Sequence, residues 1–345
     1  MVLFYQSLHR FPHPGKKKIR MSTLLVTGTG GGVGQSILKA LRTYDCRLIA
    51  ADSDPLAAGL YWQPTDRRAI IPPAADPSYV PALLELCQKQ RVSLLFPGLD
   101  AELPPLSKAK EAFAAIGARV VVSSPPVIEI ADDKLLTAVF ISEIGPYAPQ
   151  TRPVTDTPRF IGPCVLKPQR GGARSRNTFL CHTGQDFVRA LRDVDPDNCV
   201  VQDYIDGPEY TCGTVTLDGH VYGPILMRRI LRDGDTYKAF PEHRPELAAV
   251  VREIVNSLRP EGPCNVQLRV QDGSPYVLEI NARCSGTTAA RALCGFNEPK
   301  MCADYYLYRQ QPPPLSIRTD YTILRYWQET VVPNDDIDAV RESLL

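Results

Sequence analysis

The chain has 345 residues, of which 44% are hydrophobic and 22% charged, and its 39 Lys and Arg residues nearly balance 38 Asp and Glu residues. This composition is typical of a globular protein with two or three domains, each large enough to bury a core without disulfides or a structural metal. A net charge of +1 creates no long-range field for a polyanion, which argues against nucleic acid as a partner. No stretch approaches the roughly 20 consecutive apolar residues of a membrane span, which argues against a membrane partner.

Residues 1–20 are basic and lack the apolar core of a secretory signal. We expect them to be an extension that is disordered or that precedes a native start at Met21, with a mitochondrial presequence as the weaker alternative. The ten cysteines form no CxxC pair, and several lie in apolar strand-like runs. A reduced thiol there behaves as a small hydrophobe, which favours a cytoplasmic location. The five histidines show no zinc-ligand spacing.

The first region alternates strand and helix patterns. Residues 23–27 form an apolar, β-prone run, a glycine-rich segment follows at 28–34, and residues 35–44 have helical spacing. Further strands are expected at 47–52, 92–98 and 118–124, with helices at about 79–90 and 103–116. Such alternation predicts a doubly wound, Rossmann-like parallel α/β sheet over residues 21–125.

The glycine-rich segment GTGGGVG allows two interpretations. Its spacing does not match G-x-G-x-x-G, because the sixth position counted from Gly28 is Val33 and counted from Gly30 is Gln35. Asp52, at the end of the second strand, lies where a ribose-binding acid would be. A nicotinamide site is therefore one interpretation, and a tight turn or anion nest for another ligand is the favoured one.

The second region contains more strands than helices, which predicts an α+β domain over residues 126–313, with a small lid subdomain at about 150–200. A helix-like stretch over 127–145 ends at Gly145-Pro146, and two strands flank the turn at Asp218-Gly219. Further helices are expected at about 184–194 and 244–258. Residues 314–345 form a tail with the strand-like segment YTILRYW, for which capping and dimerisation both remain open.

The last hairpin, CNVQLRVQDGSPYVLEINARCSG, has one apolar and one polar face on each strand. Burying both apolar faces together requires Leu268 opposite Leu278, which places Gln267 opposite Glu279 and predicts an odd-length loop over 272–274. The shared polar face would carry Gln267, Glu279, Asn281 and Arg283. Hard oxygen ligands without His or Cys suit Mg²⁺ or Mn²⁺. The alternative is an ordinary, half-exposed polar sheet face.

Seven segments occur in the order seen in ATP-grasp ligases, and the resemblance runs from about residue 23 to residue 313. They are GTGGGVGQSILKAL, PGLDAELPPL, DDKLLT, VLKPQRGGARSRN, VVQDYIDGPEYT, CNVQL and LEINARCSG. The chain resembles the carbamoyl-phosphate-synthase-related, biotin-carboxylase-like branch of that family most. The resemblance implies a preATP-grasp domain followed by an ATP-grasp domain, with ATP and Mg²⁺ or Mn²⁺ as cofactors, and it favours the metal interpretation of the hairpin.

The resemblance also implies roles for residues that contact the nucleotide. Lys134 and Lys167 match the two lysines near the α- and β-phosphates. The segment 171–177 resembles the loop over the phosphates, in which Gly171 and Gly172 permit close backbone approach and either Arg174 or Arg176 would meet the γ-phosphate.

Four consecutive residues resemble the hinge that holds adenine through the backbone, and Glu209 matches the acid that binds ribose. Asp203 stands where Glu is more usual. Arg283 matches the arginine that stabilises the transferring phosphoryl group, and Gln267, Glu279 and Asn281 match the metal ligands. The four hinge residues are Gln202, Asp203, Tyr204 and Ile205.

The implied reaction is the activation of a carboxylate as an acyl phosphate, which an amine attacks. Asp100 and Glu102 follow a strand of the first domain and could hold an amine. Arg228, Arg229 and Arg232 could hold a carboxylate, although an ordinary exposed basic strand is an equal alternative. An amino acid or peptide-type substrate is therefore our first hypothesis, with a homodimer open. A non-catalytic ATP-binding protein and a nicotinamide-dependent oxidoreductase are the alternatives.

Overall fold

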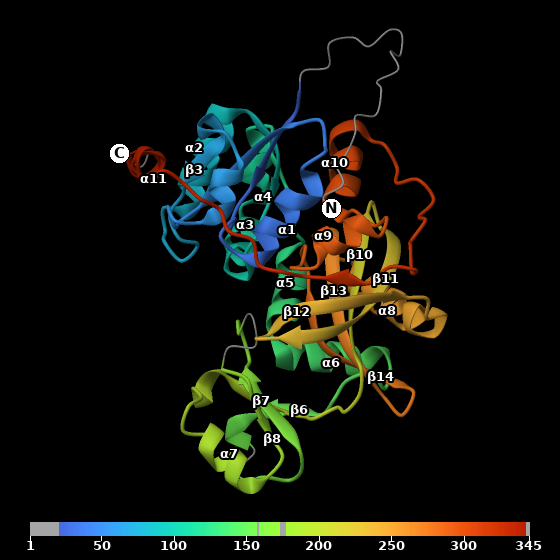
Figure 1. Cartoon of the computed structure of the whole chain (residues 1–345). Helices are drawn as coiled ribbons and strands as arrows, with labels where there is room; N and C mark the ends of the chain where they lie inside the picture. The colour runs from blue at the N-terminus through green and yellow to red at the C-terminus, as the bar shows by residue number, and fades with distance from the viewer. Residues whose placement is uncertain (1–20, 157–158, 173–176, 343–345) are drawn as a thin grey trace, which may run out of the picture.

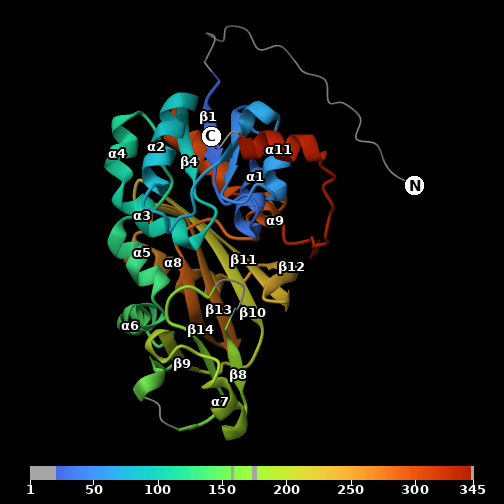
Figure 2. The same cartoon turned by 90° about the vertical axis from the view of Figure 1, so that its left-hand side faces the viewer.

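The computed structural model of the protein describes residues 21–156, 159–172 and 177–342. The predictions for residues 1–20 and for Arg174 and Arg176 lie outside the described residues. Three sheets follow one another along the molecule: a parallel sheet at one end, a six-stranded sheet in the middle and a four-stranded sheet at the other end (Figures 1 and 2). This arrangement confirms the predicted α/β domain followed by an α+β domain with a small lid.

The N-terminal sheet has five strands in the order β3-β2-β1-β4-β5, and all its pairings are parallel. Helices cover it on both sides, as predicted for a doubly wound sheet (Figure 1). The segment predicted as one helix over 103–116 contains two, because the backbone leaves the helical region at Ala109. The elements are β1 (Thr23–Val26), α1 (Gly32–Leu41), β2 (Arg47–Asp52), β3 (Arg68–Ile70), α2 (Tyr79–Gln90), β4 (Val92–Phe96), α3 (Leu103–Lys108), α4 (Lys110–Ala115) and β5 (Arg119–Val120).

A second pair of helices replaces the single one expected over 127–145. Asp133 breaks the segment (φ −97°, ψ 116°) and caps the following helix, since its carboxylate accepts from the N–H groups of Leu135 and Leu136 at 2.9 and 3.2 Å. An N-terminal cap of this kind satisfies N–H groups that have no partner within the helix. The break makes Lys134 the first residue of α6. The two helices are α5 (Pro125–Asp132) and α6 (Lys134–Ile144).

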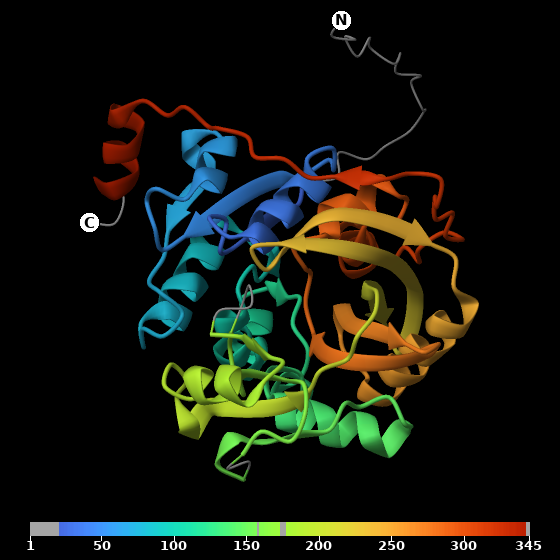
Figure 3. The same cartoon turned by 60° about the horizontal axis from the view of Figure 1, so that its bottom comes forward.

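The lid is the four-stranded antiparallel sheet, in the order β6-β9-β7-β8. Its hydrophobic cluster contains Leu166, Phe187 and Val201 and is separate from the clusters of the other two sheets. Figure 3 shows the lid in yellow-green beside the gold and orange strands of the six-stranded sheet. Its elements are β6 (Thr151–Pro153), β7 (Cys164–Pro168), β8 (Phe179–Cys181), α7 (Gly184–Ala190) and β9 (Cys199–Asp203).

The six-stranded sheet is antiparallel, in the order β14-β13-β10-β11-β12-β15. The helix predicted over 244–258 is present and packs its apolar side, including Val251 and Ile254, into the core. The elements are β10 (Glu209–Leu217), β11 (His220–Arg232), β12 (Asp235–Glu242), α8 (Pro245–Leu258), β13 (Gly262–Gln271), β14 (Ser274–Asn281), α9 (Thr288–Leu293), α10 (Glu298–Tyr308) and β15 (Ile323–Leu324).

The register predicted for the last hairpin is correct at one end and wrong at the other. Gln267 lies opposite Glu279 as predicted, but Leu268 pairs with Val277 rather than with Leu278, because a bulge falls between these pairs. The connection is therefore a two-residue turn, Asp272-Gly273, and not the predicted odd-length loop. Both turn residues have positive φ, 51° and 80°, as type I′ hairpin turns require.

The tail returns to the N-terminal sheet. In the predicted strand segment, Ile323 and Leu324 pair with β12, and the Arg325 N–H donates to the Tyr237 carbonyl of the same strand at 3.1 Å. Helix α11 (Asn334–Glu342) then packs near β3. An ion pair of 3.4 Å joins Arg68 to Asp336 there. The tail thus crosses from one sheet to the other (Figure 1, red). Within the described residues, no helix is long and apolar enough to cross a bilayer.

Candidate functional site

The polar face of the β13–β14 hairpin carries the three predicted metal ligands. Gln267 and Glu279 are cross-strand neighbours, and the Asn281 amide donates to Glu279 Oε1 at 3.0 Å. Burial alone would raise the pKa of Glu279, but the positive charges of Lys134 and Lys167 and the hydrogen bond from Asn281 outweigh it and hold the pKa below its usual value. Glu279 is therefore an ionised carboxylate among cations.

Lys167 connects the lid to the six-stranded sheet. It lies in the lid strand β7, and its Nζ donates to Gln202 Oε1 at 2.8 Å and to the Leu278 carbonyl of β14 at 3.2 Å. Burial lowers the pKa of Lys167 to about 8, with Lys134 adding to the effect and Glu279 opposing it. The structure therefore brings Lys167 to the carboxylate side chain predicted to hold the metal.

Lys134 holds the start of the glycine loop. Its Nζ donates to the Gly171 carbonyl at 3.0 Å, and its backbone N–H donates to the Gln169 carbonyl at 3.0 Å. Gly171 and Gly172 have φ values of 72° and 80°, a conformation that favours glycine. Lys134, one of the two lysines predicted to bind phosphate, thus contacts the described part of the loop.

Residues 202–205 lead from the lid to β10, as predicted for a hinge. The N–H groups of Asp203 and Tyr204 donate to the carbonyls of Gln150 and Pro163 at 2.9 and 3.0 Å. In contrast, the Ile205 N–H has no hydrogen-bond partner among the described residues. Among the described residues, no other group competes with a ligand for the Ile205 N–H.

Glu209 lies between two arginines. Arg229 Nε donates to Glu209 Oε1 at 2.9 Å, and Arg269 Nε donates to Glu209 Oε2 at 3.1 Å. Arg229 also donates to Gln267 Oε1, and Arg269 donates to the Ile205 carbonyl at 2.9 Å. Glu209 and Gln267 are thus joined through a guanidinium.

Of the three arginines on β11 that were predicted to hold a carboxylate, only Arg229 contacts the polar face, through Glu209 and Gln267. The three separate in the structure: Arg228 pairs with Glu242 at 2.7 Å, and Arg232 is an exposed side chain 3.9 Å from Asp233. Neither side chain contacts the polar face of the β13–β14 hairpin. Adjacent residues of a strand point to opposite faces, so alternation along β11 separates Arg228 from Arg229 but does not show which of them faces the site.

Arg283 forms a bidentate ion pair with the N-terminal domain. Its Nε and one terminal nitrogen donate to the two carboxylate oxygens of Asp100 at 2.6 and 2.7 Å. The same guanidinium donates to Asn281 Oδ1 and to the Cys284 carbonyl, both at 2.9 Å. Burial would raise the pKa of Asp100, but the charge and hydrogen bonds of Arg283 lower it overall.

Glu102 has a structural role and not the predicted contact with an amine substrate. It is 2% exposed, and its Oε2 accepts from Thr27 Oγ1 at 2.7 Å and from the N–H groups of Gly98 and Leu99 at 2.9 and 3.1 Å. These bonds fix the loop that presents Asp100. Because the carboxylate is enclosed and satisfied, the structure gives no support to amine binding by Glu102.

The glycine-rich segment 28–34 is a tight turn held by Asp52. The Asp52 carboxylate accepts from the N–H groups of Gly30 and Asp54 at 2.7 and 3.0 Å. The nicotinamide interpretation needs the Asp52 carboxylate to bind ribose hydroxyls. Both of its oxygens instead accept from backbone N–H groups, so the structure favours the tight-turn interpretation.

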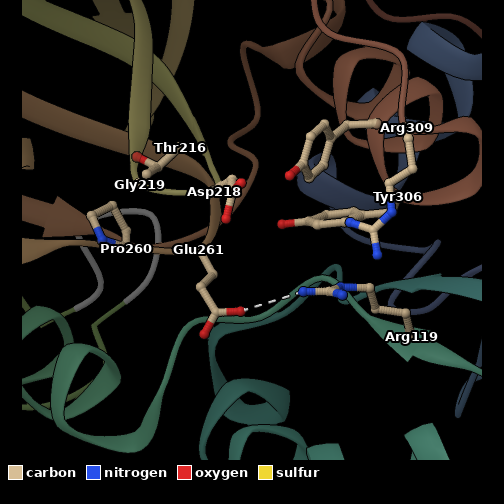
Figure 4. Close-up of a pocket in the computed structure, with 9 residues that line it drawn as sticks. Arg119, Thr216, Asp218, Gly219, Pro260, Glu261, Tyr306 and Arg309 are labelled. Carbon is tan, nitrogen blue, oxygen red and sulfur yellow. Dashed lines mark ion pairs between the residues drawn. The ribbon is translucent and has the colours of Figure 1, made fainter.

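A cavity of about 380 Å³ lies elsewhere, between the N-terminal sheet and the β10–β11 turn (Figure 4). Arg119, Tyr306 and Arg309 stand on one side of it, and Asp218 and Glu261 on the other. Its lining contains none of the side chains described above. We therefore assign it no part in this site.

Two family models match different parts of the chain. Residues 24–121 match the model of the PylC-like N-terminal domain, and residues 195–328 match a model described as "ATP-grasp in the biosynthetic pathway with Ter operon". The carbamoyl phosphate synthase large chain of Thermoanaerobacter sp. (strain X514) is 24% identical over 76% of this chain. The match spans only 27% of that relative. A D-alanine–D-alanine ligase of Fervidobacterium nodosum is 29% identical over 34% of this chain and 43% of its own length.

Solved structures share the fold at low sequence identity. The L-amino acid ligase from Bacillus licheniformis has a TM-score of 0.65 at 18% identity, covering 84% of this chain and 75% of its own. A carboxyaminoimidazole ribonucleotide synthase from Aspergillus clavatus, complexed with ATP, has a TM-score of 0.69 at 15% identity, covering 86% and 80%. These likenesses show the fold alone.

Proposed function

We propose that this chain, which belongs to the carbamoyl-phosphate-synthase-related branch of the ATP-grasp family, is an ATP- and Mg²⁺-dependent ligase. It would convert a small-molecule carboxylate into an acyl phosphate and join it to an amine. Residues 126–313 would bind the nucleotide, and the N-terminal domain would help to form the substrate site. An amino acid or peptide-type substrate is supported by the name of one sequence relative, a D-alanine–D-alanine ligase.

The observation that carries the proposal is the meeting of lid and sheet at Lys167. Lys167 touches β14 at Leu278, next to the ionised Glu279, while Lys134 holds the glycine loop. Two cations and one carboxylate flanked by amides can hold a polyphosphate together with a divalent metal. A lysine that is held by buried hydrogen bonds can bind phosphate without first being ordered.

The donor set fits Mg²⁺ when phosphate oxygens complete it. Among the described residues, no cluster of three His, Cys, Asp or Glu side chains could hold a metal unaided. Glu279, Gln267 and Asn281 offer one carboxylate and two amide oxygens, which are hard ligands without His or Cys. When bound, the metal would neutralise charge on the β- and γ-phosphates.

The remaining contacts divide by the part of the nucleotide that they would bind. The Ile205 N–H would donate to the adenine edge. Glu209 would accept from a ribose hydroxyl at Oε2, since Oε1 already accepts two hydrogen bonds from Arg229. Arg229, which lies beside Gln267, would add a cation near the terminal phosphates. Closure of the lid would exclude water, which matters because an acyl phosphate hydrolyses readily.

The reaction can be tested without knowing the substrate in advance. The full chain is incubated with Mg²⁺, ATP and pairs of amino acids, and ADP release identifies active pairs. The carboxylate of an active acid is then labelled with ¹⁸O. We expect one labelled oxygen to appear in inorganic phosphate, because the acyl phosphate passes its bridging oxygen to the leaving phosphate. ADP release with unlabelled phosphate would contradict the proposal.

A further inference from the structure

We propose that Asp100 is a positioning residue: through Arg283 it orients the amide of Asn281 toward the metal, so that the N-terminal domain controls how tightly the metal binds with ATP. This inference rests on the proposed function. It replaces the hypothesis that Asp100 binds an amine substrate.

The first step is the rigidity of Asp100. The buried Glu102 carboxylate accepts from the backbone of Gly98 and Leu99, so the loop before Asp100 is tied to the N-terminal sheet. Gly98 packs so closely on Thr27 that an added Cβ would lie 2.1 Å from its carbonyl oxygen. Asp100 is therefore presented by a loop with little freedom to move.

The second step is the geometry of the Arg283 guanidinium. Two parallel hydrogen bonds to the Asp100 carboxylate fix both the position and the plane of the group. In that plane, the remaining donors reach the Asn281 side-chain oxygen and the Cys284 carbonyl. A lysine could supply the charge but could not supply this arrangement.

The third step is the orientation of the Asn281 amide. Its oxygen accepts from the guanidinium and its nitrogen donates to Glu279. The flipped amide would turn its NH₂ group toward a cation and its oxygen toward a carboxylate, which is unfavourable at both ends. Because an amide oxygen has two lone pairs, Asn281 Oδ1 can accept from Arg283 and still bind a metal.

A continuous chain of contacts therefore runs from Asp100 through Arg283 and Asn281 to Glu279. Groups that hold metal ligands in place typically change metal affinity by about 10- to 100-fold when they are mutated. The expected signature is specific: the nucleotide should bind normally without metal, and only the gain from metal should fall. A general structural role or a substrate contact would not produce this split.

The experiment measures the dissociation constant of a non-hydrolysable ATP analogue by titration calorimetry, with Mn²⁺ and with chelator, for the full-length protein. The ratio of the two constants is the metal coupling. In Asp100→Asn we expect the coupling to fall about 10-fold or more, with the metal-free constant within twofold of wild type. An unchanged coupling, or an equal loss with and without metal, would overturn the inference.

A matched control is another ion pair between the same parts of the chain. Lys110 on α4 pairs with Glu261 at 2.7 Å, away from the site. Lys110→Gln should leave the coupling unchanged. If it lowers the coupling as Asp100→Asn does, contact between the domains, and not the orientation of Asn281, is responsible, and the inference fails.

A second variant covers the case in which Asp100→Asn unfolds. Arg283→Lys should lower the coupling by a similar factor, and the double variant should be no worse than the worse single one, because both changes act through the same contacts. Independent, multiplying losses would overturn the inference.

Absence of metal coupling in the wild type, or its persistence in Glu279→Gln, would refute the proposed function itself. Normal wild-type coupling with an unaffected Asp100→Asn would refute only the inference.

Discussion

Lys167 should make the protein less stable at neutral pH than at alkaline pH, as a consequence of its place in the site. Its pKa falls from the usual 10.5 to about 8 because the side chain is buried. Between these two values the unfolded chain binds more protons than the folded one. The contribution of Lys167 to the free energy of unfolding therefore rises with pH across this window.

The size of the effect follows from the two pKa values. A lysine shifted in this way lowers the free energy of unfolding by about 3 kcal/mol at pH 7 and by about 1.5 kcal/mol at pH 9.5. The variant Lys167→Met has a similar length and no charge, so it lacks this contribution. Relative to the variant, the wild type should become more stable by about 2 kcal/mol between these pH values.

Urea denaturation of both proteins at pH 7 and pH 9.5, at constant ionic strength, measures this difference. The thiols of the unfolded chain also titrate in this range, whereas burial raises their pKa in the folded protein. This contribution is common to both proteins and cancels in the comparison. A difference that stays constant within about 0.5 kcal/mol, or changes in the opposite direction, would refute the reasoning. The variant should also bind ATP more weakly, since it lacks the cation.

Three further predictions concern the scaffold and the polar face. Arg291→Met should reduce the free energy of unfolding by about 3–5 kcal/mol, because it leaves the fully buried Glu298 without its ion-pair partner; chemical denaturation measures this, and Arg291→Met/Glu298→Leu should recover part of it. Gly273→Ala should cost about 1–2 kcal/mol, because φ is 80°, with nucleotide affinity unchanged in calorimetry. Arg229→Gln should weaken Mg-ATP binding at least about tenfold, whereas Arg228→Gln should change it less than twofold; equal effects would contradict the placement of Arg229.

Periodicity predicted the elements of the site but not the bulges that align them. The sequence correctly placed Gln267 opposite Glu279, yet a bulge changes the pairing of Leu268. A regular two-residue hairpin at Asp218-Gly219 would pair Glu209 with Arg228. A bulge near Thr214 pairs it with Arg229 instead. The alternation of polar and apolar residues does not predict where a bulge inserts an extra residue. The sequence alone therefore could not choose between Arg228 and Arg229 as the partner of Glu209.

Contacts between residues far apart in the chain could not be predicted from the sequence pattern either. The pattern placed Asp100 at the carboxyl end of a parallel strand, where ligands often bind, and this suggested a substrate contact. The residue that pairs with Asp100 is Arg283, which lies 183 positions away in the chain. In contrast, Lys134 and Lys167 could be selected only through a family resemblance, because nothing in their local pattern distinguishes them from surface lysines.

Stabilisation by ligand tests the central claim most directly. Unfolding of the full chain is followed with Mg-ATP, with ATP and chelator, and with NAD⁺, for the wild type and Glu279→Ala. A ligand at 100 times its dissociation constant adds about 2.7 kcal/mol. We predict that Mg-ATP stabilises the wild type, that chelator reduces the effect, and that Glu279→Ala removes the dependence on metal. Stabilisation by NAD⁺ and not by ATP would contradict the assignment of the nucleotide site.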